Sequence, residues 1–343
     1  MRVRNKIATL HSNRSSYGVK VVRFAKRLVV AAISLWIVAR FTSGQARAAE
    51  SHSQKVVRQG DNIFMSFRYR KGMEMHLEIG RCGINRLVNI KALYVQSSPS
   101  GKVSPWLSHK SKLLLESSTD WIGPYTVKSD EDSDNVREAF TGGWHGSNGD
   151  ATGSPTARLD SLSVSVRGKP LMNDYVYKGA VRIHAVDYVM AFNTIKDREP
   201  VIKEVETLDI NGGVVNVQVD VIALKKITIL KYYGLQAQDF SNKGAVRYGD
   251  GPALKLGPYS DSGAKGKSNI VNKFSITPES GECTVVATMD TTFGLGRFRS
   301  IGSDMPTIFT EPYGKTYFNL IRGKGLTLRK GEEVRWKGSY AFE

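Results

Sequence analysis

The segment 140–150, FTGGWHGSNGD, gathers residue types that can act on a sugar. Four glycines lie within eight residues, from Gly142 to Gly149, so a loop can bend closely around a ligand and present Trp144 and His145. An aromatic ring offers a sugar a flat apolar face, and an imidazole can move protons near neutral pH. We predict that Trp144 binds substrate and that His145 is catalytic. The alternative is a loop whose tryptophan covers the edge of the fold.

A second group of chemical side chains lies in segment 181–192, VRIHAVDYVMAF. The alternation of a strand places Arg182, His184 and Tyr188 on one face, where they are either a site or a solvated sheet surface. His184 and Tyr188 are predicted to be catalytic and Arg182 to bind substrate. Arg158, which follows the glycine-rich loop, is a second cation for substrate binding.

A third group follows the apolar run 227–230 in the sequence KYYGLQ, residues 231–236. Strand alternation puts Tyr232 and Gln236 on one side and Tyr233 on the other. One tyrosine is therefore expected in the core and the other beside a groove. Tyr232 is a candidate for proton transfer, and Gln236 is a candidate substrate ligand.

The elements that must position these residues have the period-2 pattern of half-buried strands. Apolar residues alternate with polar ones in 161–167 and on one side of the last strand, 334–342. Two strand-like runs in 201–222 meet at Asn211-Gly212-Gly213, which predicts a hairpin. We predict an all-β, antiparallel β-sandwich, supersandwich or jelly-roll-like. A parallel β-helix is disfavoured because the sequence has no short fixed-period repeat.

A leader precedes this pattern. Eight basic residues and no acidic residue occur in 1–27, twelve uncharged residues follow in 28–39, and Ala-Arg-Ala stands at 46–48. This order predicts a signal peptide over 1–48. Twelve apolar residues fall short of the roughly 20 that span a membrane, although an uncleaved signal anchor is the alternative.

Cleavage makes the first testable prediction. The secreted protein should begin at or close to Ala49, because the small residues before it suit a signal peptidase. Amino-terminal sequencing checks this, and intact Met1 in a membrane fraction would replace cleavage with anchoring. After cleavage we expect a short extension, 49–59, and a single β-sandwich domain, 60–343, secreted or held in the cell envelope without stable membrane insertion.

The formal net charge of +17 belongs mostly to the leader, which holds ten of the 49 basic residues and none of the 32 acidic ones. The remaining 39 basic and 32 acidic residues give the rest of the chain a charge of +7. No basic stripe or nucleic-acid motif occurs, so no nucleic-acid partner is expected. A moderate positive field favours polyanions such as uronate-bearing polysaccharides, teichoic acids or anionic membrane surfaces.

The two cysteines, Cys82 and Cys283, are either one disulfide bridge or two buried thiols. Their spacing does not support a zinc site, so no cysteine-ligated metal is expected. No cofactor is predicted. Calcium remains open, because Asp150 with loop carbonyls could hold it, but the sequence has no calcium-loop signature.

The glycine-rich loop, the valine hairpin, the KYYGLQ strand and the closing YFNLI…GEEVRWKGSYAF resemble exported bacterial carbohydrate-active sandwiches. They are similar in style to the mutarotase-like and supersandwich domains of polysaccharide lyases. The resemblance covers 60–343 in pattern and matches no family motif residue by residue. It implies a sheet face or groove that binds sugars, with His, Tyr and Arg or an amide as the lyase apparatus.

We therefore expect a secreted lyase that cleaves an acidic, uronate-containing polysaccharide by β-elimination, in a groove walled by the loop 140–150 and the strand 181–192. Elimination needs a cation for the carboxylate, a base for the proton beside it, and a phenol for the leaving oxygen or as the base itself. The candidates are Arg158 or Arg182 as cation, His145 or His184 as base, and Tyr188 or Tyr232 as phenol.

Two other functions remain open. A non-catalytic glycan-binding or cell-surface protein would use Trp144, Tyr188 and Tyr232 as a stacking platform. A glycoside hydrolase needs two carboxylates roughly 5 to 9.5 Å apart. Its candidates are Asp150, Asp187, Glu204 and Glu206, and their spacing singles out no pair.

Overall fold

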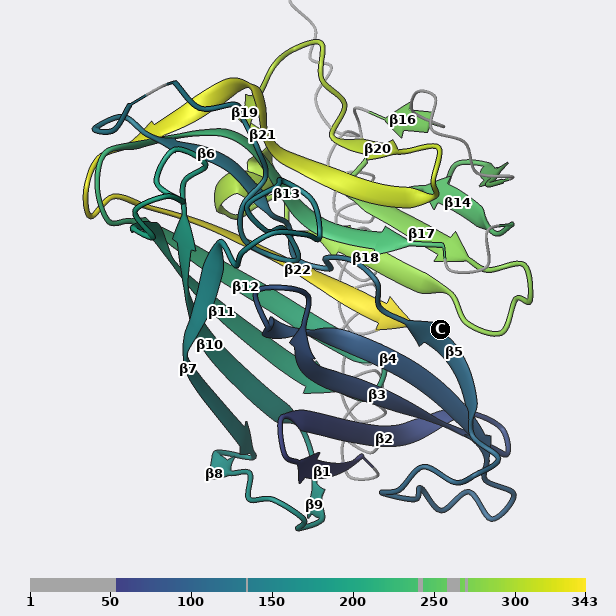
Figure 1. The fold of residues 1–343 in the computed structure, drawn as a ribbon. Helices are drawn as coiled ribbons and strands as arrows, with labels where there is room; N and C mark the ends of the chain where they lie inside the picture. Colours follow the sequence, from purple (N-terminus) through teal and green to yellow (C-terminus); the bar gives the residue numbers. More distant parts are fainter. Residues whose placement is uncertain (1–53, 134, 240–242, 258–265, 269–270) are drawn as a thin grey trace, which may run out of the picture. The chain divides into compact units, whose positions relative to one another are not determined.

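The computed structural model describes residues 54–343 except 134, 240–242, 258–265 and 269–270 (Figure 1). The predicted signal peptide lies outside the described residues. Strands form nearly all of the regular structure, and the one helical element described is a short 3₁₀ turn, η1, Gly294–Arg297. Every strand pair is antiparallel except one, so the predicted all-β, antiparallel class is confirmed. Within the described part of the chain, no helix is long and apolar enough to cross a membrane.

The first sheet has six strands in the order β5-β4-β3-β2-β1-β9. Their bounds are β1 Lys55–Gln59, β2 Asn62–Arg70, β3 Met73–Cys82, β4 Leu87–Ser97, β5 Lys112–Glu116 and β9 Tyr177–Lys178. β1 lies within the predicted extension and pairs with β2 along its whole length. Alternate apolar side chains such as Met65 and Leu77, which face each other across β2 and β3, are completely buried.

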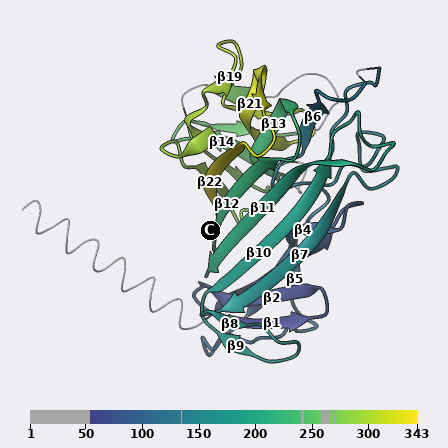
Figure 2. The ribbon, with the colours of Figure 1, turned by 90° about the vertical axis from the view of Figure 1, so that its left-hand side faces the viewer.

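The second sheet has ten strands in the order β15-β14-β17-β18-β22-β12-β11-β10-β7-β8. Their bounds are β7 Ala157–Val166, β8 Lys169–Pro170, β10 Val181–Met190, β11 Pro200–Asn211, β12 Val214–Ala223, β14 Ala245–Tyr248, β15 Ala253–Lys255, β17 Lys273–Thr277, β18 Val285–Met289 and β22 Glu333–Phe342. Figure 2 shows the long strands β7, β10, β11 and β12 side by side.

The predicted valine hairpin is confirmed as β11 and β12. Asn211 pairs with Val214, and Gly212 turns the chain at a φ of 59°, a conformation that glycine adopts without strain. Val215 and the alternate valines after it are buried, whereas the residues between them face away from the core. One face of the ten-stranded sheet is therefore covered and the other is open to solvent.

The third sheet has the order β16-β20-β21-β13-β6, and β19 pairs in parallel with β21. Its bounds are β6 Tyr125–Ser129, β13 Ile227–Gln238, β16 Gly266–Ser268, β19 Ser300–Ile301, β20 Ile308–Thr310 and β21 Lys315–Leu328. The register between β13 and β21 shifts at three places near Tyr232 and Tyr233. Such bulges change the direction of side chains. Here they lie in the segment that holds the predicted site residues Tyr232 and Gln236.

Buried apolar side chains from all three sheets form one large core, and Tyr233, Phe309 and Tyr317 form a second, small cluster. Trp121 and Trp336 are its largest members, and the indole nitrogen of Trp336 donates to the hydroxyl oxygen of Tyr232 at 2.7 Å. Cys82 and Cys283 are separate buried thiols, and burial raises the pKa of each to about 11. Of the two interpretations of the cysteines, the structure has the unbridged one.

Candidate active site

The glycine-rich loop is anchored to a buried carboxylate that the sequence did not single out. Asp120 is 1% exposed, and its Oδ1 accepts a hydrogen bond from the backbone nitrogen of Trp144 at 2.5 Å. Gly143 has a φ of 51°, and a Cβ there would lie 2.1 Å from Asp120 Oδ1. Glycine is required at this position because the backbone passes directly against the carboxylate. The loop therefore holds the next residue, His145, beside Asp120.

Asp120 stands between two basic side chains. Its Oδ2 lies 3.6 Å from Nδ1 of His145 and 3.3 Å from Nζ of Lys315. Lys315 is almost completely buried, whereas about a fifth of the His145 side chain is exposed. Since Nδ1 is the buried nitrogen of that ring, the exposed part of the imidazole lies on its other edge. One edge of His145 is therefore open to solvent, while Asp120 lies beside the other edge.

Burial lowers the pKa of both basic groups. It lowers the pKa of His145 below its ordinary value of 6.5; Lys315 lowers that pKa further, and Asp120 and the more distant Asp150 oppose the shift. Burial also lowers the pKa of Lys315, against the attraction of Asp120. The imidazole is therefore neutral at pH 7, which is the form that accepts a proton.

Aromatic rings continue from His145. The ring of Phe140 lies 5.2 Å from the His145 ring and 5.6 Å from that of Tyr233. Tyr233 lies 5.6 Å from Phe309, and the guanidinium of Arg322 stands 5.0 Å over the Phe309 ring. Arg322 also donates to the Tyr233 hydroxyl at 3.4 Å. The half-buried Arg322 and the His145 imidazole therefore both lie against the same group of aromatic side chains.

Tyr317 connects these residues into a closed circuit of contacts. Its side chain lies 4.9 Å from Tyr233, and Nζ of Lys315 stands 4.9 Å from its ring centre. Its hydroxyl is 2.6 Å from that of Tyr313, which is 41% exposed. The contacts therefore run from His145 through Asp120, Lys315, Tyr317, Tyr233 and Phe140 back to His145.

Several polar atoms at this place are buried without a hydrogen-bond partner: Nε1 of Trp144, Nδ1 of His145, both side-chain polar atoms of Gln236 and Oδ1 of Asn319. Gln236 and Asn319 belong to the site because they pair across β13 and β21 with Tyr317 and Tyr233. Nearly all buried polar atoms in folded proteins are paired, so this concentration makes the place a candidate site, although its aromatic residues also pack as a small hydrophobic cluster.

The structure separates the two tyrosines of the KYYGLQ strand as the alternation indicated. Tyr232 is completely buried in the core, where it stacks on Tyr125 at 4.2 Å. Its hydroxyl cannot reach a substrate from there. Tyr233 is the residue that belongs to the circuit of contacts, and burial raises its pKa to about 12, so its hydroxyl keeps its proton at neutral pH.

The other predicted residues lie on the solvent face of the ten-stranded sheet. Arg182 forms two hydrogen bonds to Asp209, at 2.7 and 2.9 Å, and Nδ1 of His184 lies 3.3 Å from a threonine hydroxyl. Arg158 stands 4.5 Å over the ring of Tyr188. None of the contacts of these four side chains involves His145 or the residues around it.

The expectation of one groove walled by the loop and β10 is wrong. A Cβ on Gly142 would lie 3.1 Å from Val189, which is a core-facing residue of β10. Tyr188 and the other polar residues of that strand project from the opposite face, because side chains alternate along a strand. The loop and the polar face of β10 are therefore on two sides of one sheet.

A cavity of about 640 Å³ opens on that solvent face. Amide, hydroxyl and charged groups of five neighbouring strands line it, including Arg182, Asn216, Gln218, Ser339 and Lys337. Such a lining can hydrogen-bond sugar hydroxyls. It does not include His145, Lys315 or Tyr233.

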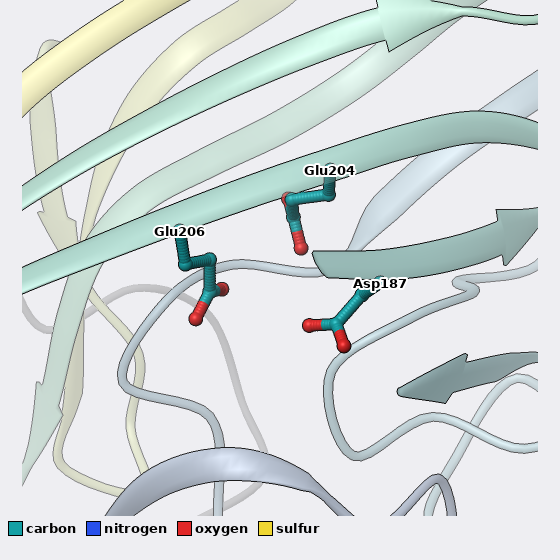
Figure 3. Close-up of side chains that lie close together, drawn as sticks. All are labelled: Asp187, Glu204 and Glu206. Carbon is teal, nitrogen blue, oxygen red and sulfur yellow. The ribbon is translucent and has the colours of Figure 1, made fainter. Parts of the chain in front are cut away.

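Three of the four carboxylates considered for hydrolysis come together (Figure 3). Asp187 on β10 pairs directly with Glu204 on β11, and Glu206 lies two residues further along the same face. They are 0%, 3% and 6% exposed, and the adjoining cavity of about 20 Å³ has room for about one water molecule. A sugar cannot reach them, so they do not form a hydrolase pair. Asp150 lies apart, exposed in the loop.

No protein-family model matches the chain. No curated protein matches it either. The chain is similar in structure to a family 36 α-galactosidase from Geobacillus stearothermophilus in complex with stachyose, with 9% identity, a TM-score of 0.38 and coverage of 84% of this chain and 40% of that one. It therefore spans about two fifths of the length of that enzyme.

Two further similar structures are covered almost completely by this chain. Galactose 1-epimerase from Lactobacillus acidophilus has 8% identity, a TM-score of 0.34 and coverage of 83% of this chain and 96% of that one. A galactose mutarotase-like protein from Lactobacillus casei has 10% identity, a TM-score of 0.37 and coverage of 84% and 100%. At these TM-scores, none of the likenesses assigns a function to the chain.

Proposed function

We propose that this protein is a lyase that cleaves an acidic polysaccharide by β-elimination at the His145 site. One observation carries the proposal: a neutral imidazole beside the buried Asp120 belongs to the same set of contacts as an arginine and a phenol. A base, a cation and a proton donor are the three groups that elimination of a uronate requires. Only His145 among these was a candidate from the sequence.

Arg322 takes the place first given to Arg182. Its guanidinium lies among aromatic rings, where it contacts no carboxylate in the described ion pairs, whereas Arg182 is already occupied by Asp209. A guanidinium binds a sugar carboxylate by two parallel hydrogen bonds and offsets the charge that develops on it. Lys231, 6.0 Å from the ring of Phe140, adds a second positive charge beside the site.

The chemical step then follows from the two other groups. His145 takes the proton from the carbon next to the carboxylate, and the electron pair left behind forms a carbon–carbon double bond. The bond between the neighbouring carbon and the glycosidic oxygen breaks. The leaving oxygen takes a proton from the hydroxyl of Tyr233, which is protonated at neutral pH and lies next to Arg322.

A screen of the purified protein against uronate polysaccharides tests this function. Elimination creates a double bond conjugated with the carboxylate, so we expect new ultraviolet absorbance together with new reducing ends. Reducing ends without absorbance would mean hydrolysis and would refute the lyase.

A second candidate function is favoured by the polar cavity of about 640 Å³ on the solvent face of the ten-stranded sheet. In this alternative the protein binds a glycan there without cleaving it, and Arg182 and the neighbouring amides hold the sugar. Binding in the same screen, with neither absorbance nor reducing ends, is the result that selects it.

A further inference from the structure

We propose that Asp187, Glu204 and Glu206 hold a calcium ion in the core of the sandwich. The three residues each offer one carboxylate oxygen, and these oxygens all lie within 4.8 Å of one another (Figure 3). All three side chains project from the covered face of β10 and β11, where Asp187 and Glu204 are direct cross-strand partners.

The three carboxylates lack a full set of hydrogen-bond partners among the described residues. Asp187 is completely buried, and neither of its oxygens has a hydrogen-bond partner; Oε2 of Glu206 has none either. No ion pair among the described residues involves any of the three carboxylates. A buried carboxylate is costly unless it is paired or bound to a metal, and three adjacent ones multiply that cost.

A hydrogen-bond donor points at the cluster and fits a negative charge on it. Tyr125 donates a hydrogen bond to Oε2 of Glu204. A phenol that donates to a carboxylate fits an ionised acceptor, which a bound cation would stabilise.

The donor set favours a hard cation. Oxygen-only ligands suit calcium, whereas zinc prefers nitrogen and sulfur. Two ligands of one calcium ion lie at most about 4.6 to 5.2 Å apart, and the three carboxylates offer oxygens within 4.8 Å of one another, so one calcium ion can bridge them. The cavity of about 20 Å³ lined by Glu204 and Glu206 leaves room for one water in the coordination shell.

Asp150 is the calcium candidate from the sequence, and the structure gives that residue other partners. Oδ1 of Asp150 accepts hydrogen bonds from the backbone nitrogen and hydroxyl of Thr152. Asp150 is therefore a matched control: an exposed carboxylate, outside the cluster, whose charge can be removed separately.

The alternative to a cation is a protonated cluster. Burial, with repulsion from Glu204, raises the pKa of Asp187 to about 8, and burial raises that of Glu204 to about 7. Burial and both neighbours raise the pKa of Glu206 well above its ordinary value. In that form the acids would be neutral at pH 7 and the protein would not respond to calcium.

Thermal unfolding of the full chain separates the two. After chelation with EDTA, about 1 mM free Ca²⁺ should raise the Tm by roughly 5 °C, because only the folded state assembles the three ligands. Asp187→Asn and Glu206→Gln keep the side-chain size and should abolish the rise, whereas Asp150→Asn should retain it. Circular dichroism of each variant verifies the fold.

Calorimetric titration of the wild type covers the case in which a variant does not fold. One calcium per chain supports the site. No heat and no Tm shift with Ca²⁺, or an undiminished shift in folded Asp187→Asn, would overturn it. A larger shift with Mg²⁺ than with Ca²⁺ would overturn the choice of ion. None of these measurements depends on the lyase activity.

Discussion

Replacing His145 with alanine should slow cleavage of the active substrate by about 10²- to 10⁴-fold, because the reaction loses its positioned base. His145 is only partly buried, and its Nδ1 makes no hydrogen bond with the described residues, so the variant should stay folded. The initial rate of ultraviolet absorbance gives the effect. His184→Ala is the matched control, because that imidazole lies on the other face of the ten-stranded sheet. An equal loss in both variants would contradict the assignment.

The pH dependence separates a base from a structural residue. The rate should fall as the pH drops through the pKa of His145, and because burial and Lys315 lower that pKa, the acid limb should lie below pH 6.5. Asp120 and Asp150 oppose the shift and Lys315 reinforces it, so Lys315→Met should move the limb to higher pH. A limb that does not move in this variant would mean that another group titrates.

The period-2 patterns predicted the strands because alternation follows directly from strand geometry. The hairpin at Asn211 to Gly213 is the clearest case: glycine meets the positive φ of the turn, and β-branched residues on one face meet the core. The glycine-rich loop was also found, since glycines such as Gly143 are needed where the backbone passes close to other groups, here Asp120. Local physics was sufficient for both.

The partners of His145 were missed because they are distant in sequence. Asp120 precedes β6, Lys315 begins β21 and Arg322 lies further along it, and an isolated Asp, Lys or Arg has no local pattern that marks it. Only tertiary packing brings Asp120 and Lys315 together, 195 residues apart. The false groove has a related cause, because a strand pattern tells which residues share a face but not which face another segment covers.

The buried carboxylates did have a sequence signal. Glu204 and Glu206 have the same parity as Ile202 and Leu208, so alternation places both glutamates on the core face of that strand. Asp187 likewise shares parity with the apolar face of its own strand. Three acids on core faces conflict with an apolar interior, and such a conflict is expected at a functional site.

The ion pair of Asp120 with Lys315 is the other place where a single substitution should have a large effect. Asp120→Ala should lower the free energy of unfolding by about 3–5 kcal/mol, because it leaves the buried Lys315 without its counter-charge. Urea unfolding measures this. Asp209→Ala is the matched control: it breaks the exposed pair with Arg182, and should cost at most about 1 kcal/mol.

Lys315→Met completes the comparison. The double variant should be less destabilised than the sum of the two single variants, since removing both charges together leaves neither one unpaired. Asp120 also holds the loop through the backbone nitrogen of Trp144, and that part of its effect should persist in the double variant. If Asp120→Ala unfolds within about 0.5 kcal/mol of the wild type, the carboxylate does not stabilise the buried cation.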